Sequence, residues 1–125
     1  MAKSFNDKSF NSDEKLFRAV YPPEISDMFW RRDGSLSSAA FADPKGLSVD
    51  RQGDRTVEES ARSMMQRFTG NIVYVRFKSC KEIGATVKYL PSTGNPYHSE
   101  IHGSDTVPLL SKSQRRYLSR KAVLI

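Results

Sequence analysis

The stretch TVEESARSMMQRFTGNIVYVRF, residues 56–77, decides the fold of this 125-residue chain. Thr56 and Glu59 stand three positions apart, the spacing of a capping box, which predicts a helix start. The apolar residues that follow form one helical stripe, and Gly70 is placed to end the helix. The run NIVYVRF at 71–77 then predicts a strand that is apolar enough to be central in a sheet. A helix that packs on a sheet is therefore the first expectation.

Further elements are predicted on both sides of this unit. Strands are expected at 15–21, 85–90 and 97–102, short helices at 24–29 and 79–83, and a last helix from Ser111, with Gln114 as its capping partner. Residues 36–41 and 47–51 flank the turn DPKG at 43–46 and read as a hairpin, although 37–40 suits an irregular loop nearly as well. The order predicts an α+β fold with a mixed, mainly antiparallel sheet and about three to four helices packed on it.

The length suits one domain, and we assign residues 14–125 to it and residues 1–13 to a flexible N-terminal arm. Cys80 is the only cysteine, which excludes an intrachain disulfide and favours a reducing compartment. We see no signal peptide and no window near the roughly 20 apolar residues of a membrane helix. These features predict a cytoplasmic protein with no membrane partner.

Positive charge is concentrated at the C-terminal end of the chain. The net charge is +6, and the last fifteen residues hold five Lys and Arg side chains and no acid. A helical wheel groups Lys112, Arg115, Arg116 and Arg120 with Ser119 on one side, and Gln114, Tyr117, Leu118 and Lys121 on the other. The cationic side predicts contact with a polyanion, either nucleic acid or an acidic protein partner, and a solvated cationic face is the plain alternative.

A second cationic site lies where Trp30 precedes Arg31 and Arg32. An aromatic ring beside two guanidinium groups suits the stacking of a base while a phosphate is held. The alternative is that Trp30 only ends a packed helix.

The strand expected at 97–102 carries both histidines of the chain. Strand alternation places His98, Glu100 and His102 on one face, with neighbours about 7 Å apart. Imidazoles and a carboxylate are ligands for zinc and related cations, and they also serve as general acid and base on a phosphoester. The trio is therefore a candidate metal site and a candidate catalytic site, and a polar exposed strand face is the alternative.

The order Arg18, then Ser38, then Glu100 is similar to the ADP-ribosyltransferase superfamily. By that resemblance Arg18 would hold NAD, Ser38 would support it and Glu100 would orient the ribose. His98 departs from the pattern, because many members carry Gln or Glu two residues before the catalytic Glu.

A wider resemblance rests on three strings: SSAAF at 37–41, GLSVDR at 46–51 and NPYH at 95–98. Together they resemble a group of small bacterial proteins with no assigned activity. Their polar residues, among them Asp50, lie in predicted turns and strand ends, where side chains reach a ligand. An internal ion pair at Asp50–Arg51 is an equal alternative to a ligand role.

Three functions follow from these patterns. The first is a binding module whose basic C-terminal helix engages a polyanion. The second is an enzyme that uses His98, Glu100 and His102, with Arg18, Ser38 or Asp50, on a phosphoester or on NAD. The third is a structural subunit of a protein complex. The sequence identifies neither a cofactor nor an oligomeric state.

Overall fold

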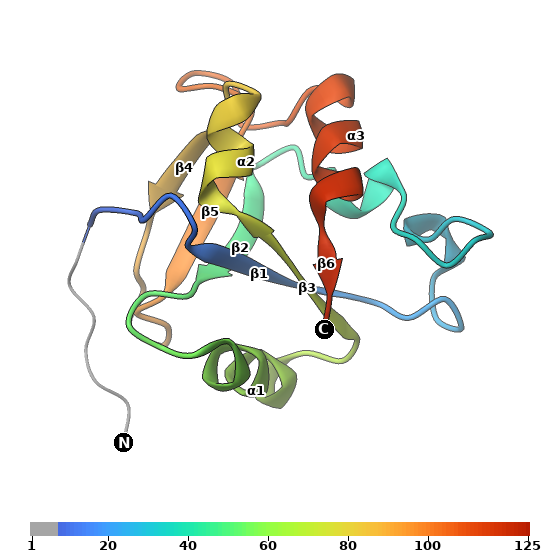
Figure 1. Cartoon of the computed structure of the whole chain (residues 1–125), viewed down its shortest axis with the longest axis horizontal. Helices are drawn as coiled ribbons and strands as arrows, with labels where there is room; N and C mark the ends of the chain where they lie inside the picture. The colour runs from blue at the N-terminus through green and yellow to red at the C-terminus, as the bar shows by residue number, and fades with distance from the viewer. Residues whose placement is uncertain (1–7) are drawn as a thin grey trace.

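The computed structural model describes residues 8–125, which form one sheet with helices on both faces (Figure 1). The strands are β1 (Lys15–Val20), β2 (Leu47–Arg51), β3 (Asn71–Arg76), β4 (Thr86–Tyr89), β5 (His98–His102) and β6 (Val123–Leu124). Their order in the sheet is β4-β5-β2-β1-β3-β6. The expected α+β class is confirmed. All of the strand pairs found in the described residues are antiparallel, so the sheet is not the mixed one that was expected.

Three α-helices accompany the strands in the described part of the chain, at the low end of the expected number. They are α1 (Val57–Arg67), α2 (Phe77–Glu82) and α3 (Lys112–Lys121), and two 3₁₀ turns, η1 (Asp27–Phe29) and η2 (Ser38–Phe41), precede β2. The capping boxes expected from the sequence are present: Thr56 with Glu59 starts α1, and Ser111 with Gln114 starts α3. The helix starts were predictable because each capping interaction spans only three residues.

Helix α1 covers one face of the sheet. Its buried residues Ala61 and Met64 pack against Phe17 of β1 and Ile72 of β3. This small apolar cluster lies over the β1–β3 half of the sheet, and Figure 1 places α1 apart from the other helices.

The opposite face holds the larger core. Leu118 of α3, Cys80 of α2 and Phe41 of η2 are buried there with Leu47 and Ile101 from the sheet. Helix α3 and η2 lie against each other on this face. The two faces are therefore unequal, with α2, α3 and η2 on one and α1 alone on the other.

The hairpin expected across the DPKG turn is wrong. Residues 38–41 form η2, and β2 pairs with β1 and β5. Ser and Ala are poor strand formers, and here Ala40 and Phe41 are buried in the tight 3₁₀ turn beside α3. The DPKG turn itself is present, since the amide of Gly46 donates to the carbonyl of Asp43 (3.2 Å). Strand β6 has no counterpart among the elements predicted from the sequence.

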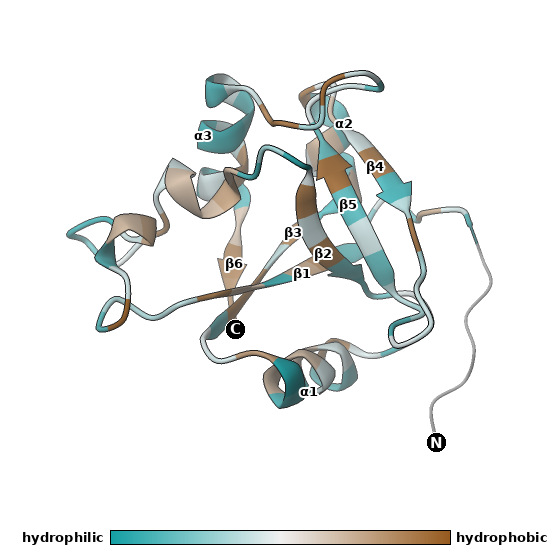
Figure 2. Cartoon of the chain, turned by 180° about the vertical axis from the view of Figure 1, so that it is seen from behind, coloured by the Kyte–Doolittle hydropathy of each residue, from teal (hydrophilic) through white to brown (hydrophobic). Residues whose placement is uncertain are grey.

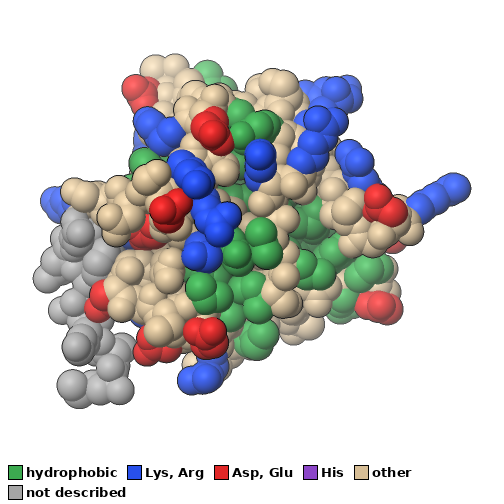
Figure 3. Space-filling model, viewed as in Figure 1, with side chains coloured by type: hydrophobic (Ala, Val, Ile, Leu, Met, Phe, Trp, Pro, Cys, Tyr) green, Lys and Arg blue, Asp and Glu red, His purple; other side chains and the backbone are tan. Residues whose placement is uncertain are grey.

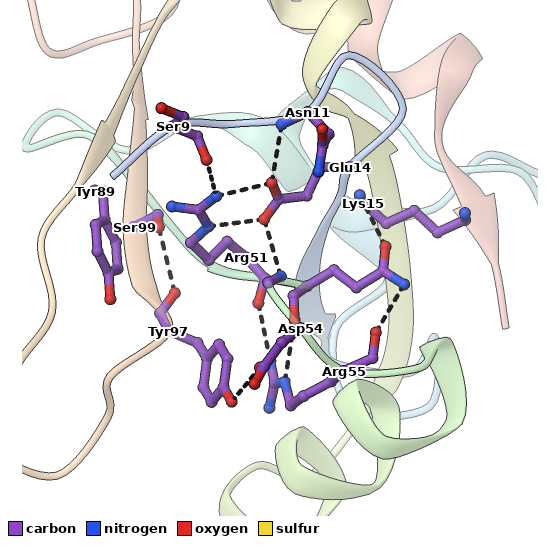
Figure 4. Close-up of polar contacts among 12 residues, drawn as sticks. Ser9, Asn11, Glu14, Lys15, Arg51, Asp54, Arg55, Tyr89, Tyr97 and Ser99 are labelled. Carbon is purple, nitrogen blue, oxygen red and sulfur yellow. Dashed lines mark hydrogen bonds and ion pairs between the residues drawn. The ribbon is translucent and has the colours of Figure 1, made fainter. Parts of the chain in front are cut away.

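The N-terminal segment contacts the domain from residue 9 onward. Phe10 stacks on Phe77, with ring centroids 5.0 Å apart, and also lies over the Arg51 guanidinium. Arg51 forms a buried ion pair with Glu14 (2.7 Å) and also donates to the carbonyl of Ser9 (Figure 4). The flexible arm was expected over 1–13; residues 1–7 lie outside the described residues, whereas residues 9–13 contact the domain.

Among the described helices, none combines the length and the apolar character that crossing a membrane requires.

Candidate functional site

The sheet face under α1 is apolar on one half and polar on the other. In antiparallel strands, residues that pair directly share a face. Phe17 pairs with Asp50, and Asp50 pairs with His98, so one row runs from the apolar cluster into β5. Ser48 and Glu100 form the next pair along β2 and β5. In Figure 2, β5 carries both hydrophilic and hydrophobic colours along its length, as expected for a strand whose two faces differ. This polar half, which α1 leaves open, is the candidate site.

A cavity of about 270 Å³ lies between this polar half and the end of α1. Three residues from separate parts of the sequence, Arg18, Asp50 and His98, line the same cavity. Its full lining is Arg18, Ala19, Ser48, Val49, Asp50, Met64, Arg67, Phe68, Asn95 and His98. We call it the α1 cleft.

Arg18 fills the place where two strands separate. Strands β1 and β2 pair only at Leu16–Arg51 and Phe17–Asp50, and no further pair follows. The Arg18 side chain bridges the gap: Nη1 donates to the carbonyl of Ser48 (3.2 Å), and Nε donates to the carbonyl of Ala40 (2.9 Å). Main-chain acceptors that lack a strand partner are thereby satisfied.

The charge of Arg18 is not neutralised by a carboxylate. Within residues 8–125 it makes no ion pair, and its second amino group, Nη2, has no hydrogen-bond partner. Burial lowers the pKa of Arg18, and the more distant carboxylate of Asp43 partly offsets this effect. A partly desolvated cation of this kind gains from an anionic ligand, and guanidinium suits phosphate oxygens.

Asp50 organises the cleft from beneath. Its side chain is 4% exposed. One oxygen accepts from the amide of Asn95 (2.8 Å), and the other pairs with Arg67 at the end of α1. The expected alternative of an ion pair with Arg51 is not what the chain adopts, because Arg51 pairs with Glu14 instead. Since both oxygens of Asp50 are engaged, we assign it a positioning role.

The three side chains expected on one face of β5 are there, and Glu100 links the two imidazoles. His102 Nε2 lies 2.8 Å from Glu100 Oε1, and His98 Nε2 lies 3.6 Å from Glu100 Oε2. Only His98 lines the α1 cleft, whereas His102 is buried next to Gly46. Within the described residues, no group of three or more His, Cys, Asp and Glu side chains is arranged to hold a metal ion, so we carry the metal role no further.

Gly46 makes close approach to this trio possible. Its φ is +105°, and a Cβ there would lie 2.5 Å from His102 Nε2 and 2.9 Å from Glu100 Oε1. Only glycine fits both the backbone conformation and the available space. The DPKG turn thus closes over His102 and Glu100 and leaves His98 as the imidazole that reaches the cleft.

Ser38 does not line the α1 cleft. It lies in η2, on the sheet face that α3 covers. The segment SSAAF at 37–41 contributes a main-chain group instead, the carbonyl of Ala40, which accepts from Arg18. Ser48 is the cleft residue that the sequence did not single out: its carbonyl accepts from Arg18, it lines the cleft, and it pairs with Glu100. Ser48 lies two residues before Asp50 on a predicted strand, and residues at this spacing share a face of the sheet, which is the signal that could have identified it.

A second cavity, of about 610 Å³, adjoins the α1 cleft, and Arg67 and Asn95 line both. Arg55 lines the larger one and stacks on the Tyr97 ring, 3.6 Å from its centroid. Burial lowers the pKa of Arg55 and raises the pKa of Tyr97 to about 12, and the Tyr97 hydroxyl donates to Asp54 (2.8 Å). A ligand longer than the α1 cleft therefore has room to extend.

The expected cationic side of α3 needs correction at two positions. Ser119 is buried, and Arg115 is partly buried, with its guanidinium donating to the carbonyl of Leu110. Leu118 is the only fully buried apolar side chain of this polar helix. Because Ser119 is buried with it, the buried side of the helix includes a polar residue that hydropathy alone assigns to the exposed side. The exposed cationic face consists of Lys112, Arg116 and Arg120, with Lys121 beside it. Figure 3 shows Lys and Arg side chains along α3.

The residues Trp30 and Arg31 meet the end of α3. A groove of about 370 Å³ lies between the turn at residues 30–36 and α3, and Trp30, Arg31 and Arg120 all line it. Arg32 is exposed on the same turn but does not line the groove. Arg31 and Arg120 belong to two separate candidate sites in the sequence, and the fold brings them to one groove.

Cys80 takes no part in either site. It is buried in the core of the α2–α3 face, and burial raises the pKa of its thiol to about 12. A thiol of this kind is a packed apolar group and not a nucleophile.

Comparison with known proteins gives no relative: no family model, no curated protein and no solved structure matches this chain.

Proposed function

We propose that the protein binds a phosphate-bearing nucleotide in the α1 cleft and that His98 transfers a proton in a reaction on it. The observation that carries the proposal is that Arg18 and His98 line one cavity. Arg18 has no carboxylate partner among the described residues; its Nε and Nη1 reach through the gap between β1 and β2 to the carbonyls of Ala40 and Ser48, which leaves Nη2 for a ligand. Arg18 offers a guanidinium to phosphate, and His98 offers an imidazole to the reacting group.

The surroundings of His98 support a catalytic role. Glu100 lies 3.6 Å from its Nε2 and is held in turn by His102. A carboxylate next to an imidazole helps to fix the orientation of the ring. His98 is thus suited to donate or accept a proton, while Glu100 acts through it.

NAD is the first nucleotide to test. The resemblance to the ADP-ribosyltransferases implies Arg18, Ser38 and Glu100 around it, but Ser38 does not line the cleft and we put Ser48 in its place. The carbonyl of Ser48 accepts from Arg18 across the gap between β1 and β2, and Ser48 pairs with Glu100 of β5. NAD and a simple phosphoester share the phosphate that Arg18 would bind, and they differ in the bond that breaks. The adjoining cavity gives a dinucleotide room for its second half.

Binding is tested by thermal unfolding in the presence of NAD, ADP or inorganic phosphate. We expect NAD and ADP to raise the Tm of the native chain, since a ligand that binds only the folded state stabilises it. Arg18→Gln should abolish the shift, whereas Arg62→Gln, which removes an exposed cation from α1, should preserve it. If none of the three ligands shifts the Tm, the proposal fails.

Turnover is tested separately, by release of nicotinamide from NAD and by hydrolysis of a nitrophenyl phosphoester. His98→Asn and Glu100→Gln should each reduce turnover while leaving the ligand-induced Tm shift in place. Because Arg18 also supports the fold, His98→Asn is the cleaner variant. A ligand that binds but is not turned over would remove the acid–base role and leave a binding protein.

A further inference from the structure

The strongest feature outside the α1 cleft is the groove between the turn at residues 30–36 and the end of α3. It lies on the sheet face that α3 and η2 cover, and α1 covers the other. No residue lines both the groove and the α1 cleft. The two sites are therefore physically separate, and what binds here does not follow from the proposed function.

The aromatic wall of the groove is held in a fixed orientation. Trp30 Nε1 donates to the carbonyl of Tyr21 (2.7 Å), and Trp30 also forms a β-bridge with Leu36. The amide of Arg31 donates to the carbonyl of Ser35 (2.7 Å), which closes the turn. Such a ring loses little conformational freedom when a flat group stacks on it, and fixed aromatic rings of this kind bind successive bases of single strands.

The cations around the groove form no ion pair within the described part of the chain. No ion pair within residues 8–125 involves Arg31, Arg120 or the other exposed cations of this face, which are Arg32, Lys112, Arg116 and Lys121. Asp33, on the same turn, accepts hydrogen bonds from the amide and hydroxyl of Ser35 (2.9 and 2.6 Å), and these bonds, together with the charge of Arg31, lower its pKa. Its single negative charge is outnumbered by the cations of this face. The face therefore presents a positive field with a spacing along the helix that suits a phosphate backbone.

The cations extend away from the ring in one direction. Lys112, Arg116 and Arg120 stand one helical turn apart along α3, and Arg120 is the one that reaches the groove. Successive phosphates of a strand can follow such a row while one base enters the groove beside Trp30. The groove volume lies within the roughly 300–1,000 Å³ of pockets that take a small molecule.

From this arrangement we infer that the face formed by Trp30, Arg31 and the exposed cations of α3 binds single-stranded nucleic acid, with one base stacked on Trp30 and the phosphates along α3. Trp30 packs against the core and also lines the groove. An acidic protein would satisfy the charge but would make no use of the part of the ring that lines the groove. Double-stranded nucleic acid keeps its bases paired and cannot offer one to the groove.

The chain contains a single tryptophan, so its fluorescence reports on the groove directly. Titration with oligo(dT) or oligo(U) at low salt should quench the fluorescence of Trp30 because a base stacks on it. Anisotropy of a labelled oligonucleotide should give an affinity that falls as salt rises. Duplex DNA of the same length should bind more weakly and leave the fluorescence unchanged.

The variant Arg116→Gln with Arg120→Gln should reduce the slope of log affinity against log salt by about 2, roughly one unit for each cation that no longer neutralises a phosphate. A matched control, Lys45→Gln with Arg62→Gln, removes the same charge from exposed positions elsewhere and should leave the slope unchanged. Trp30→Phe should lower affinity without changing the slope.

Three outcomes would overturn the inference. They are no binding to single strands at low salt, binding without quenching of Trp30, and equal loss of affinity in the control pair. Tight binding of poly-glutamate in place of the oligonucleotide would reassign the face to an acidic protein partner. Failure here is distinguishable from failure of the nucleotide site, since Arg116→Gln with Arg120→Gln should leave the NAD-induced Tm shift intact.

Discussion

The side-chain amide of Asn95 donates to the buried carboxylate of Asp50, 45 residues earlier in the chain (2.8 Å). This hydrogen bond joins β2 to the turn before β5, and the pairing of the same carboxylate with Arg67 joins both to α1. Three elements that form the α1 cleft are thus held by one side chain. The cleft is a fixed part of the fold because its supports come from distant segments of the chain.

The first prediction concerns that carboxylate. Arg67→Gln leaves the charge of Asp50 buried with only Asn95 as a side-chain partner, and we expect a loss of about 1–3 kcal/mol in the free energy of unfolding, as for a buried polar group that loses a partner. Arg62→Gln on the exposed side of the same helix should change it by less than about 0.5 kcal/mol. Urea unfolding measures both, and equal effects would show that the Asp50–Arg67 pair carries no stability.

A second prediction concerns the buried pair of Glu14 and Arg51. Both side chains are almost fully buried, at 3% and 1% exposure. Removing one partner strands a charge, so Glu14→Gln or Arg51→Met should each cost about 3–5 kcal/mol. The double variant should cost much less than the sum, because no charge is left unpaired. Additive effects in a double-mutant cycle by urea unfolding would contradict this interpretation.

Glycine substitutions give a third prediction with an internal control. Gly34 and Gly46 both have positive φ, at +88° and +105°, but a Cβ at Gly34 meets nothing within 4 Å. Gly34→Ala should therefore cost only the backbone strain, about 1–2 kcal/mol. Gly46→Ala adds the clash with His102 and Glu100 and should lower the Tm further. Equal Tm values for the two variants would show that the DPKG turn can move away from β5.

The thiol of Cys80 supplies a prediction on pH. Folding raises its pKa from the ordinary value of 9.0 to about 12, because burial disfavours the thiolate. The folded protein then keeps a proton that the unfolded chain loses, so this contribution to stability is complete below pH 9.0 and is lost as the pH rises toward 12. Cys80→Ala should flatten the loss of stability over that range, as followed by urea unfolding at a series of pH values.

The same burial makes Cys80 a probe of unfolding. Iodoacetamide at about pH 8 should label the native protein only as fast as it opens globally, and denaturant should accelerate labelling to the rate of a free thiol. Rapid labelling of the native chain would show that the core of the α2–α3 face is accessible.

The sequence by itself determined the elements whose causes are local. Thr56 with Glu59 and Ser111 with Gln114 predicted the starts of α1 and α3, because a capping box spans only three residues. The alternation of β5 placed its imidazoles on one face, since successive side chains of a strand point in opposite directions. The positive charge of α3 was also readable, as composition alone fixes it.

Only the tertiary structure decided which of these residues meet. Arg18 bridges β1 and β2 because the strands separate there, and no local pattern marks that separation. Residues 38–41 form a 3₁₀ turn because Ala40 and Phe41 are buried beside α3. This packing outweighs the local pattern that predicted a hairpin strand. On α3, one buried leucine among polar residues left the orientation of the helix to its neighbours, which turned Ser119 inward and Arg115 toward Leu110. Contacts between distant segments depend on strand order and on which helix face is buried, and neither is a property of a short stretch of chain.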